Sequence, residues 1–380
     1  MRAAQCKALL QMLAHIDEKN ATQLLLATAT RFRTAGIRAE AEIQAQALAE
    51  RRGWTVDEMA DRTIPAGGLE DDGTLEISYG DKGRTFVARL DSALRVALAY
   101  EGNAIKALPA AHKGESEDDV KAAKSAFSKS KKEIDAVVKM QRTRLYEAMC
   151  TQRTWRFEDW DALLAKHPIV QHLVTGVVWV AQSGGEETSF RPHGDGTLST
   201  AKHRDYKPAP DAIVRVAHPL TLHDSHVTDW TEHLGDFEIL PLFPQFGRAT
   251  RAVAEGDAKK RECSDFVGHM VEAFKLRSRA DALGFARGEA EDGGWFYGYK
   301  KIFPSLGLQA IVNFSGNSMP EENKTVALQT ITFERTTDEE RGAIALGEIP
   351  PVLFSEVWND AQDIARTGTG FDPAWESKVR

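Results

Sequence analysis

The sequence lacks the motifs of the common enzyme classes. It has no phosphate-binding P-loop, no Rossmann glycine fingerprint, no zincin helix and no nucleophile elbow. No apolar run approaches the roughly 20 residues that a membrane-spanning helix requires. The N-terminus has His15, Asp17 and Glu18 where a signal peptide would be apolar. These absences predict a cytoplasmic protein that has no membrane partner and no bound cofactor.

Cysteine is scarce, and basic charge is not in excess. The 380 residues include three cysteines, Cys6, Cys150 and Cys263, in no metal-type spacing. We therefore expect reduced thiols and not a disulfide scaffold. The formal net charge of -8 argues against a generally basic surface for nucleic acid. The content of 42% hydrophobic and 27% charged residues is typical of a soluble globular chain with two or three domains.

Hydrophobic periodicity predicts an α+β fold in several parts. Thr55 to Glu58 form a capping-box pattern, and Asn20 and Thr154 are expected to cap further helices. Helix is expected again over 251–290, followed by three antiparallel strands between 294 and 333. The expected segments are an N-terminal helical segment like the end of a HEAT-like repeat region (1–62), a small β meander (63–110), a long amphipathic helix (111–152), a mixed α/β core (153–250) and a C-terminal α+β segment (251–380).

The long helix is the clearest single prediction. Ser116 can cap its start, and apolar residues then recur along one face as far as residue 150. Between Lys129 and Arg144 it carries six basic residues against two acidic ones. If nucleic acid binds this chain, we expect it to bind this basic helix. The alternative, which we favour, is a solvated face, because no aromatic residue alternates with the charges.

The central stretch is rich in tryptophan and histidine. Trp155, Trp160, Trp179 and Trp230 are expected core anchors. The aromatic run from Trp295 to Tyr299 could stack nucleic-acid bases, but we expect it to be buried in a sheet, as alternating aromatics usually are. Eight of the eleven histidines lie between 167 and 233. Most are expected to be structural, with the imidazoles of both His-Pro pairs on backbone carbonyls. A zinc or iron site remains an alternative for His218, His223, Asp224 and His226, with His193 and Asp195, although their spacing matches no ligand motif.

A group of polar residues stands beside the turns and prolines that end the expected strands. Such ends commonly carry functional side chains. Two arginines would suit an anionic group, and a histidine could serve as acid or base near neutral pH. The alternative is structural ion pairing, Arg191 with Asp195 or Arg248 with Glu238. The candidate binding residues are Arg191, Asp195, His218, Gln245 and Arg248.

The same stretch resembles a known bacterial family. The order Trp-x4-Trp, His-Pro, Val-Trp, Phe-Arg-Pro with Asp-Gly-Thr-Leu, Val-Ala-His-Pro-Leu and Pro-x-x-x-Gln-x-x-Arg resembles the domain of unknown function 4132 (DUF4132) of MolR-like (molybdate metabolism regulator-like) proteins. The likeness is close over about 130 to 250, and the stretch that ends in Ser355 and Glu356 is also similar. It implies that residues 1–62 are the end of a helical repeat region. It implies no chemistry for any residue, and the chain has no Trp-Gly-Arg tripeptide to imply DNA binding.

Together these features favour a non-enzymatic, cytoplasmic protein-interaction or regulatory module with a protein partner. The alternative is a hydrolase or transferase that acts on an anionic substrate, with metal dependence possible. An enzyme should gather Arg191, His218 and Arg248 around one concave pocket, whereas a module should leave them paired and dispersed. The sequence is compatible with a complete chain and with the C-terminal part of a longer one.

Overall fold

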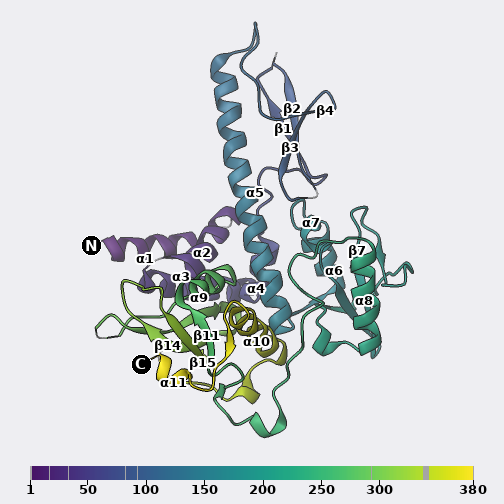
Figure 1. The fold of residues 1–380 in the computed structure, drawn as a ribbon. Coiled ribbons are helices and arrows are strands. Elements are labelled where there is room, and N and C mark those ends of the chain that lie inside the picture. The colour runs from purple at the N-terminus through teal and green to yellow at the C-terminus, as the bar shows by residue number, and fades with distance from the viewer. Residues whose placement is uncertain are drawn as a thin grey trace. The chain divides into compact units, whose positions relative to one another are not determined.

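The chain forms two compact units of helices and antiparallel sheets, and the α+β class is confirmed (Figure 1). The computed structural model describes residues 2–16, 18–32, 34–81, 83–91, 93–291, 293–336 and 342–379. Unit 1 comprises Met1–Leu145, Thr154–Val216 and Glu232–Phe243, and unit 2 comprises Tyr146–Arg153, Ala217–Thr231 and Pro244–Arg380. Among the described residues, no helix is both long and apolar enough to cross a membrane.

Unit 1 begins with a small helical bundle. Its helices are α1 (Arg2–Leu13), α2 (Lys19–Arg31), α3 (Ala35–Arg52) and α4 (Val56–Arg62). Leu25, Ala41 and Met59 are fully buried in its core. The capping box at the start of α4 is confirmed, because Thr55 and Glu58 exchange both hydrogen bonds. The prediction for Asn20 is wrong: α2 already begins at Lys19, so Asn20 lies in its first turn.

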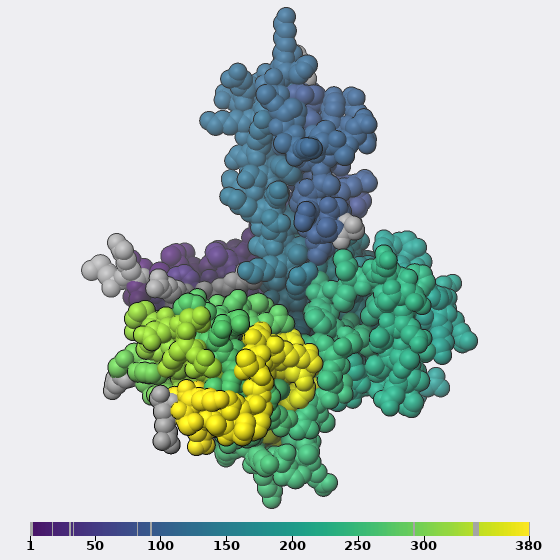
Figure 2. All heavy atoms as spheres, in the orientation of Figure 1, coloured from purple at the N-terminus to yellow at the C-terminus, as the bar shows by residue number. Residues whose placement is uncertain are grey.

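A sheet of strand order β1-β2-β3-β4 follows and packs on helix α5 (Glu117–Thr151). Its strands are β1 (Thr74–Ser78), β2 (Thr85–Leu90), β3 (Val96–Tyr100) and β4 (Asn103–Ile105). Figure 2 shows this sheet lying along α5 in blue. Tyr79 and Phe86 of the sheet share a core with Val120 of the helix. The prediction of one uninterrupted helix is confirmed, with Ser116 accepting a hydrogen bond from the Asp119 amide (3.3 Å).

The central sheet of unit 1 has the strand order β5-β9-β6-β7-β8. Its strands are β5 (Thr154–Arg156), β6 (Trp179–Ser183), β7 (Glu186–Pro192), β8 (Leu198–Ser199) and β9 (Ile213–Val216), and it carries the short helices α6 (Phe157–Trp160) and α7 (Gln171–Val174). The Trp160 ring lies 5.2 Å from the Trp179 ring, measured between centroids. Thr154 pairs with Arg215 in the sheet, so the prediction that it caps a helix is wrong.

The predicted tryptophan anchors are buried. Trp160, Trp179 and Trp230 have no exposed surface, and Trp155 retains 7%. Trp155 also donates its indole N–H to the buried Asp61 carboxylate (2.8 Å). Trp230 lies in α8 (Asp224–Asp236).

Unit 2 is built on a sheet of order β12-β13-β14-β15-β11-β16, with β10 paired to β15. Its strands are β10 (Glu262–Cys263), β11 (His269–Glu272), β12 (Ala286–Arg287), β13 (Phe296–Phe303), β14 (Leu308–Asn317), β15 (Thr325–Arg335) and β16 (Gly370–Phe371). The three predicted strands are β13, β14 and β15. The prediction of helix over 251–290 is wrong except for α9 (Ala273–Ala282), because β11 is held between β15 and β16 by backbone pairing.

Helix α10 (Pro351–Ala365) packs against α9, β11 and β15, and α11 (Trp375–Lys378) follows it. The helix is buried on most of its circumference, polar residues included. The expectation of a wholly buried aromatic run in β13 is only half correct. Phe296 and Tyr299 are buried, whereas Trp295 (38%) and Tyr297 (44%) are exposed.

Candidate functional site

The most unusual feature of unit 2 is a row of carboxylates on the buried helix α10. Glu356, Asp360 and Asp363 are spaced by four and three residues, which puts them on one face of the helix. Glu356 and Asp360 are each only 2% exposed. Burying a carboxylate is costly unless it is paired and hydrogen-bonded. The partners of these acids therefore decide what the site can do.

Glu356 receives hydrogen bonds from three side chains. His218 Nε2 lies 3.4 Å from Oε1, and Arg248 Nη1 lies 3.1 Å from Oε2. The Tyr146 hydroxyl, in the last turns of α5, donates to the same Oε2 (3.4 Å). His218 Nδ1 accepts from the Leu220 amide (3.2 Å). The imidazole proton is therefore assigned to Nε2, from which it points at Glu356.

Asp360 is held by two cations. Lys301 Nζ lies 2.8 Å from its Oδ2, and Arg248 Nη2 lies 3.4 Å from its Oδ1. Burial raises the pKa of Asp360, and the attraction of Lys301 and Arg248 opposes that rise. The Lys301 ammonium also lies 4.8 Å from the ring centre of Tyr146, a cation–π distance. Lys301 is thus fixed by a carboxylate and an aromatic ring together.

Asp363 closes the row. It lies 2.9 Å from Arg279 Nη2 and 3.5 Å from Arg248 Nη2. Arg248 therefore bonds all three carboxylates. We call this set the α10 charge cluster, and it consists of His218, Arg248, Arg279, Lys301, Glu356, Asp360 and Asp363. The exposed Arg366 also lies 3.6 Å from Asp363, so each of the three carboxylates is paired with at least one cation without a ligand.

The groups near the cluster are poorly suited to nucleophilic catalysis. Burial raises the pKa of the Cys150 thiol and of the Tyr146 hydroxyl well above their ordinary values. Both groups stay protonated near neutral pH, and a thiol reacts only as the thiolate. This arrangement supports a structural role, in which charge pairing fixes α10 against the other elements of unit 2.

The structure brings together three of the five predicted site residues, all in unit 2. His218 and Arg248 bind opposite oxygens of Glu356. Gln245 is 3% exposed and donates to the Ala217 carbonyl (2.7 Å), next to His218 in the chain. An ion pair of Arg248 with Glu238 was the structural alternative. The Arg248 guanidinium instead binds the carboxylates of α10. His218 and Arg248 thus belong to the cluster, and Gln245 holds the backbone next to His218.

Arg191 and Asp195 belong to unit 1 and are held by local contacts. Arg191 Nη1 donates to the carbonyls of Thr175 (3.1 Å) and Pro192 (3.3 Å). Asp195 Oδ1 accepts from the amide (3.0 Å) and the hydroxyl (2.7 Å) of Thr197, which makes a side-chain turn. Within the described residues the expected Arg191 to Asp195 ion pair is therefore replaced by backbone and hydroxyl contacts.

One serine–histidine pair in unit 1 has the spacing of a nucleophile and its base. His193 Nε2 lies 2.7 Å from Ser199 Oγ, and Arg191 Nη2 lies 3.3 Å from His193 Nδ1. Arginine can only donate, so Nδ1 must accept and the imidazole proton sits on Nε2. That tautomer cannot take a proton from the serine. A hydrolytic dyad would need the opposite tautomer.

The alternative metal site is not assembled in the described part of the chain, where no three His, Cys, Asp or Glu side chains converge as metal ligands. His218 is committed to Glu356 and the Leu220 amide. His223 contacts the Ser225 hydroxyl (2.9 Å). His193 Nε2 lies 2.7 Å from Ser199 Oγ, and Asp195 Oδ1 accepts from the amide and the hydroxyl of Thr197.

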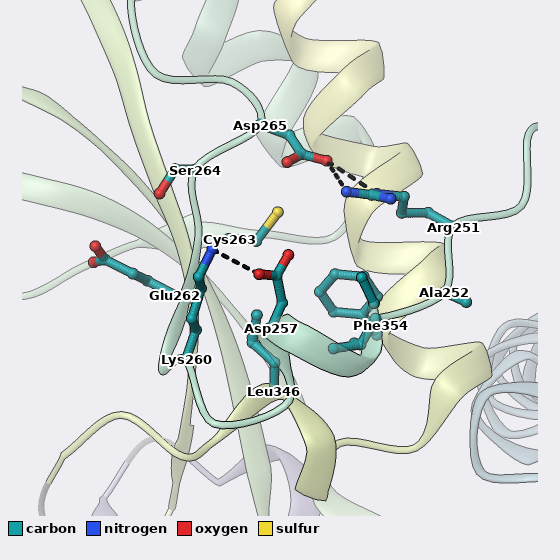
Figure 3. Close-up of a pocket in the computed structure, with 12 residues that line it drawn as sticks. Arg251, Ala252, Asp257, Lys260, Glu262, Cys263, Ser264, Asp265, Leu346 and Phe354 are labelled. Atoms are coloured by element: carbon teal, nitrogen blue, oxygen red, sulfur yellow. Dashed lines mark hydrogen bonds and ion pairs between the residues drawn. The ribbon is translucent and has the colours of Figure 1, made fainter.

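A pocket in unit 2 lies between residues 251–257, β10 and the start of α10 (Figure 3). It holds about 400 Å³ of empty space, its open mouth included. Leu346 and Phe354 are its large apolar residues in the close-up, and Cys263 lies among the charged side chains. The walls of the pocket carry two ion pairs, Arg251 with Asp265 (3.0 Å) and Lys260 with Asp257 (2.6 Å).

The pocket therefore offers paired charges and a protonated thiol. Burial raises the pKa of Cys263 to about 11, so little thiolate exists near neutral pH. The sequence pattern did not indicate this pocket, because its walls come from an irregular segment and from elements about 90 residues apart.

The basic face of α5 is largely exposed. Lys129, Lys131, Lys132, Lys139 and Arg142 are all exposed. Arg144 instead lies 2.7 Å from the buried Asp61 carboxylate. One of the six basic residues is therefore structural, and the others form a solvated strip. Binding of nucleic acid to this strip stays a prediction.

The sequence reasoning missed most partners of the cluster. The stretch that resembles the family includes Glu356, but no sequence pattern distinguishes Asp360, Asp363 or Lys301. The available signal was the spacing of the acids in an otherwise apolar helix, because an acidic row on an apolar helix requires buried cations. The sequence does not show which cations pair with these acids.

Comparison with known proteins gives a family match without an assigned activity. The family model described as a domain of unknown function, DUF4132, matches residues 102–285. The chain is also similar to the uncharacterized protein YehI of Escherichia coli (strain K12), with 26% identity over 263 residues. That match covers 68% of this chain and 21% of the relative, so the chain spans about a fifth of that protein. No solved structure matches the chain.

The family match includes α5, the central sheet, α8 and α9. It contains His218 and Arg248 but ends before α10. The carboxylates that bind these two residues thus come from outside the matched region.

Proposed function

We propose that the chain is a non-enzymatic, cytoplasmic protein-interaction module, and that the outer face of α1 is its interaction surface. The observation that carries this proposal is the exposure of Leu9 (58%) and Met12 (64%) on a helix whose other face is buried. Leu9 and Met12 lie one helical turn apart, and exposed apolar residues that lie together are typical of sites of protein contact. The three free cysteines are compatible with a reducing compartment.

The alternative, a hydrolase or transferase for an anionic substrate, requires unpaired cationic groups around a pocket. Arg248 is bonded to three carboxylates, and His218 has hydrogen bonds at both ring nitrogens. Arg191 Nη1 donates to two backbone carbonyls. These pairings favour the module over the enzyme. A regulatory role rests on the resemblance to MolR-like proteins alone.

Site-specific photo-cross-linking tests the surface. A benzophenone amino acid is placed at Met12 of the full chain in cells, and at Lys121, an exposed polar position on α5, as the matched control. We expect a protein adduct from position 12 and none from position 121. Adding Leu9→Glu to the Met12 probe should remove the adduct, because a charge on the apolar face opposes burial. Equal adducts at both positions, or an adduct unaffected by Leu9→Glu, would overturn the proposal.

A further inference from the structure

A hairpin of unit 1 carries a histidine in a backbone conformation that usually takes glycine. The bridge between Ser199 and Asp205 closes the hairpin, and the Thr200 amide donates to the Arg204 carbonyl across its turn (3.0 Å). His203 in this turn has a φ of 56°, in the left-handed region. Hairpin loops of three residues commonly place glycine there. A larger side chain at such a position is a reason to look for a role of that side chain.

The His203 ring stacks on a buried histidine of α8. The ring centres of His203 and His233 are 4.9 Å apart, with 32° between their planes. Phe237 lies against both rings, at 4.8 and 5.0 Å. His233 is only 4% exposed, and its Nδ1 lies 3.0 Å from the Ala201 carbonyl of the same turn. His233 therefore attaches the last turn of α8 to the hairpin, and all of these residues belong to unit 1.

This attachment suits uncharged rings. A carbonyl only accepts, so Nδ1 of His233 donates and carries the proton of the neutral ring. A second proton would be added at Nε2, which is buried. It would set a charged ring against His203, and two charged rings at this distance repel each other. Histidine is the side chain that ordinarily gains its charge just below neutral pH.

The groups around the stack oppose a positive charge on it. Burial lowers the pKa of His233, and the nearby Arg191, His203 and His193 lower it further, while the hydrogen bond to Ala201 opposes the change. The other charged groups of the hairpin and of the end of α8 are Asp195, Lys202, Arg204, Asp205, Asp229, Glu232, Asp236 and Glu238. Apart from the half-buried Asp229, these groups are exposed, so water screens them.

We propose that His203 and His233 form an acid-sensitive latch, in which the uncharged rings hold the last turn of α8 on the hairpin and protonation of the rings releases it. Histidine switches of other proteins work by the same change of charge. The segment after His233 is also held at its far end, where the Leu242 amide donates to the Gly176 carbonyl (2.9 Å). A backbone hydrogen bond does not titrate near neutral pH, so that end stays attached. The latch is independent of the α1 surface, and each proposal can fail alone.

Hydrogen exchange of the full chain, followed by mass spectrometry at pH 7.5 and 5.5, tests the latch. The reporter peptide covers 234–239, where the Phe237 and Ile239 amides donate to the carbonyls of His233 and Leu234. After correction for the intrinsic effect of pH on exchange, its protection should fall roughly tenfold or more at pH 5.5. A peptide of β6, in the middle of the central sheet of unit 1, reports unfolding of the whole unit. The reporter should lose clearly more protection than β6.

Variants separate the charge of the stack from its shape. His203→Phe and His233→Phe each keep a ring in the stack and remove one of its charges, so protection of the reporter should change little between the two pH values. His203→Arg carries a charge at both pH values and should release the reporter already at pH 7.5. His226→Arg is the matched control, because His226 is an exposed histidine of α8, and it should behave like the wild type.

Several results would overturn the latch. They are a wild-type reporter that loses no more protection than β6 at pH 5.5, a loss in both phenylalanine variants equal to that of the wild type, and equal release at pH 7.5 by His226→Arg and His203→Arg. Full protection in His203→Arg at pH 7.5 would also contradict it. If His203→Arg unfolds the whole unit, β6 shows this, and the two phenylalanine variants then decide.

Discussion

The dipeptide His-Pro occurs twice in the chain, once in each unit. The two histidines make the same hydrogen bond to a backbone amide two residues further along the chain. In unit 1, His167 Nδ1 accepts from the Ile169 amide (3.1 Å). In unit 2, His218 Nδ1 accepts from the Leu220 amide (3.2 Å). In both cases the imidazole caps the turn that follows the proline, so this contact is set by the dipeptide and its immediate neighbours.

The two histidines differ at the other ring nitrogen. His167 Nε2 bonds the Ile64 carbonyl (3.2 Å), a neutral backbone group. His218 Nε2 bonds the buried Glu356 carboxylate, a group that also binds Arg248. The expectation of a backbone carbonyl is therefore confirmed for His167 and wrong for His218. The same dipeptide closes a turn in one unit and anchors a charge cluster in the other.

The largest expected effect comes from removing the carboxylate that makes the two sites different. Glu356→Ala leaves Arg248, the His218 N–H and the Tyr146 hydroxyl without their shared acceptor in a buried site. We expect a loss of roughly 3 to 5 kcal/mol in the free energy of unfolding, the range for breaking a buried ion pair. Urea unfolding at pH 7 measures it. Glu356→Gln keeps the shape and should cost less, and equal stability of Glu356→Ala and wild type would contradict the structure.

The two histidines themselves give a smaller, directly comparable effect. His218→Ala should cost about 1 to 3 kcal/mol, because it strips a donor from a buried carboxylate. His167→Ala should cost about 1 kcal/mol, the usual value of a lost cap. A double-mutant cycle with Glu356→Gln should show coupling for His218 and none for His167. Coupling of both histidines, or of neither, would remove the distinction between them.

The sequence predicts those parts of the fold that depend on local pattern. The 35-residue helix α5, the capping box at Thr55 and the strands β13 to β15 all follow from periodicity or spacing within a few turns. The errors lie where a distant strand decides the structure. Residues near Met270 look helical by their apolar spacing but pair with Ala327 and Gly370. Backbone pairing over such a distance leaves no local trace.

The candidate site follows the same rule. The sequence identified His218, Gln245 and Arg248, which stand beside prolines and turns, as residues with a special role. It could not supply their partners, because Glu356 lies 138 residues from His218 and 108 from Arg248. Arg191, which the sequence groups with them, lies in unit 1 and is held there by two backbone carbonyls. Residue type and local context thus indicate that a side chain is held in place, but they do not identify the residue that holds it.

The buried histidines of unit 1 should make stability depend on pH. Burial lowers the pKa of His167, and of His172, His193 and His233, all of unit 1. The unfolded chain then binds protons that the folded chain does not, so stability is full above about pH 6.5 and falls as pH decreases toward the lowered pKa values. One such histidine contributes at most about 1.4 kcal/mol per pH unit.

Melting temperatures at pH 7.5 and 5.5 measure this loss. His167→Gln removes one titrating group and should make the dependence shallower. If the melting temperature of the variant depends more steeply on pH than that of the wild type, the predicted direction of the effect is wrong.

The smallest effect on the free energy of unfolding is expected for charged side chains that are exposed. Lys129, Lys131 and Lys132 are exposed on α5, and each substitution by Gln should change the free energy of unfolding by less than about 0.5 kcal/mol. Arg144 on the same helix is the matched control, because its guanidinium lies 2.7 Å from Asp61, whose side chain is 3% exposed. Arg144→Gln should therefore be clearly more destabilising than any of the lysine changes. The midpoints of urea unfolding of the four variants measure the difference in stability. Equal midpoints would mean that the ion pair of Arg144 with the buried Asp61 does not stabilise the fold.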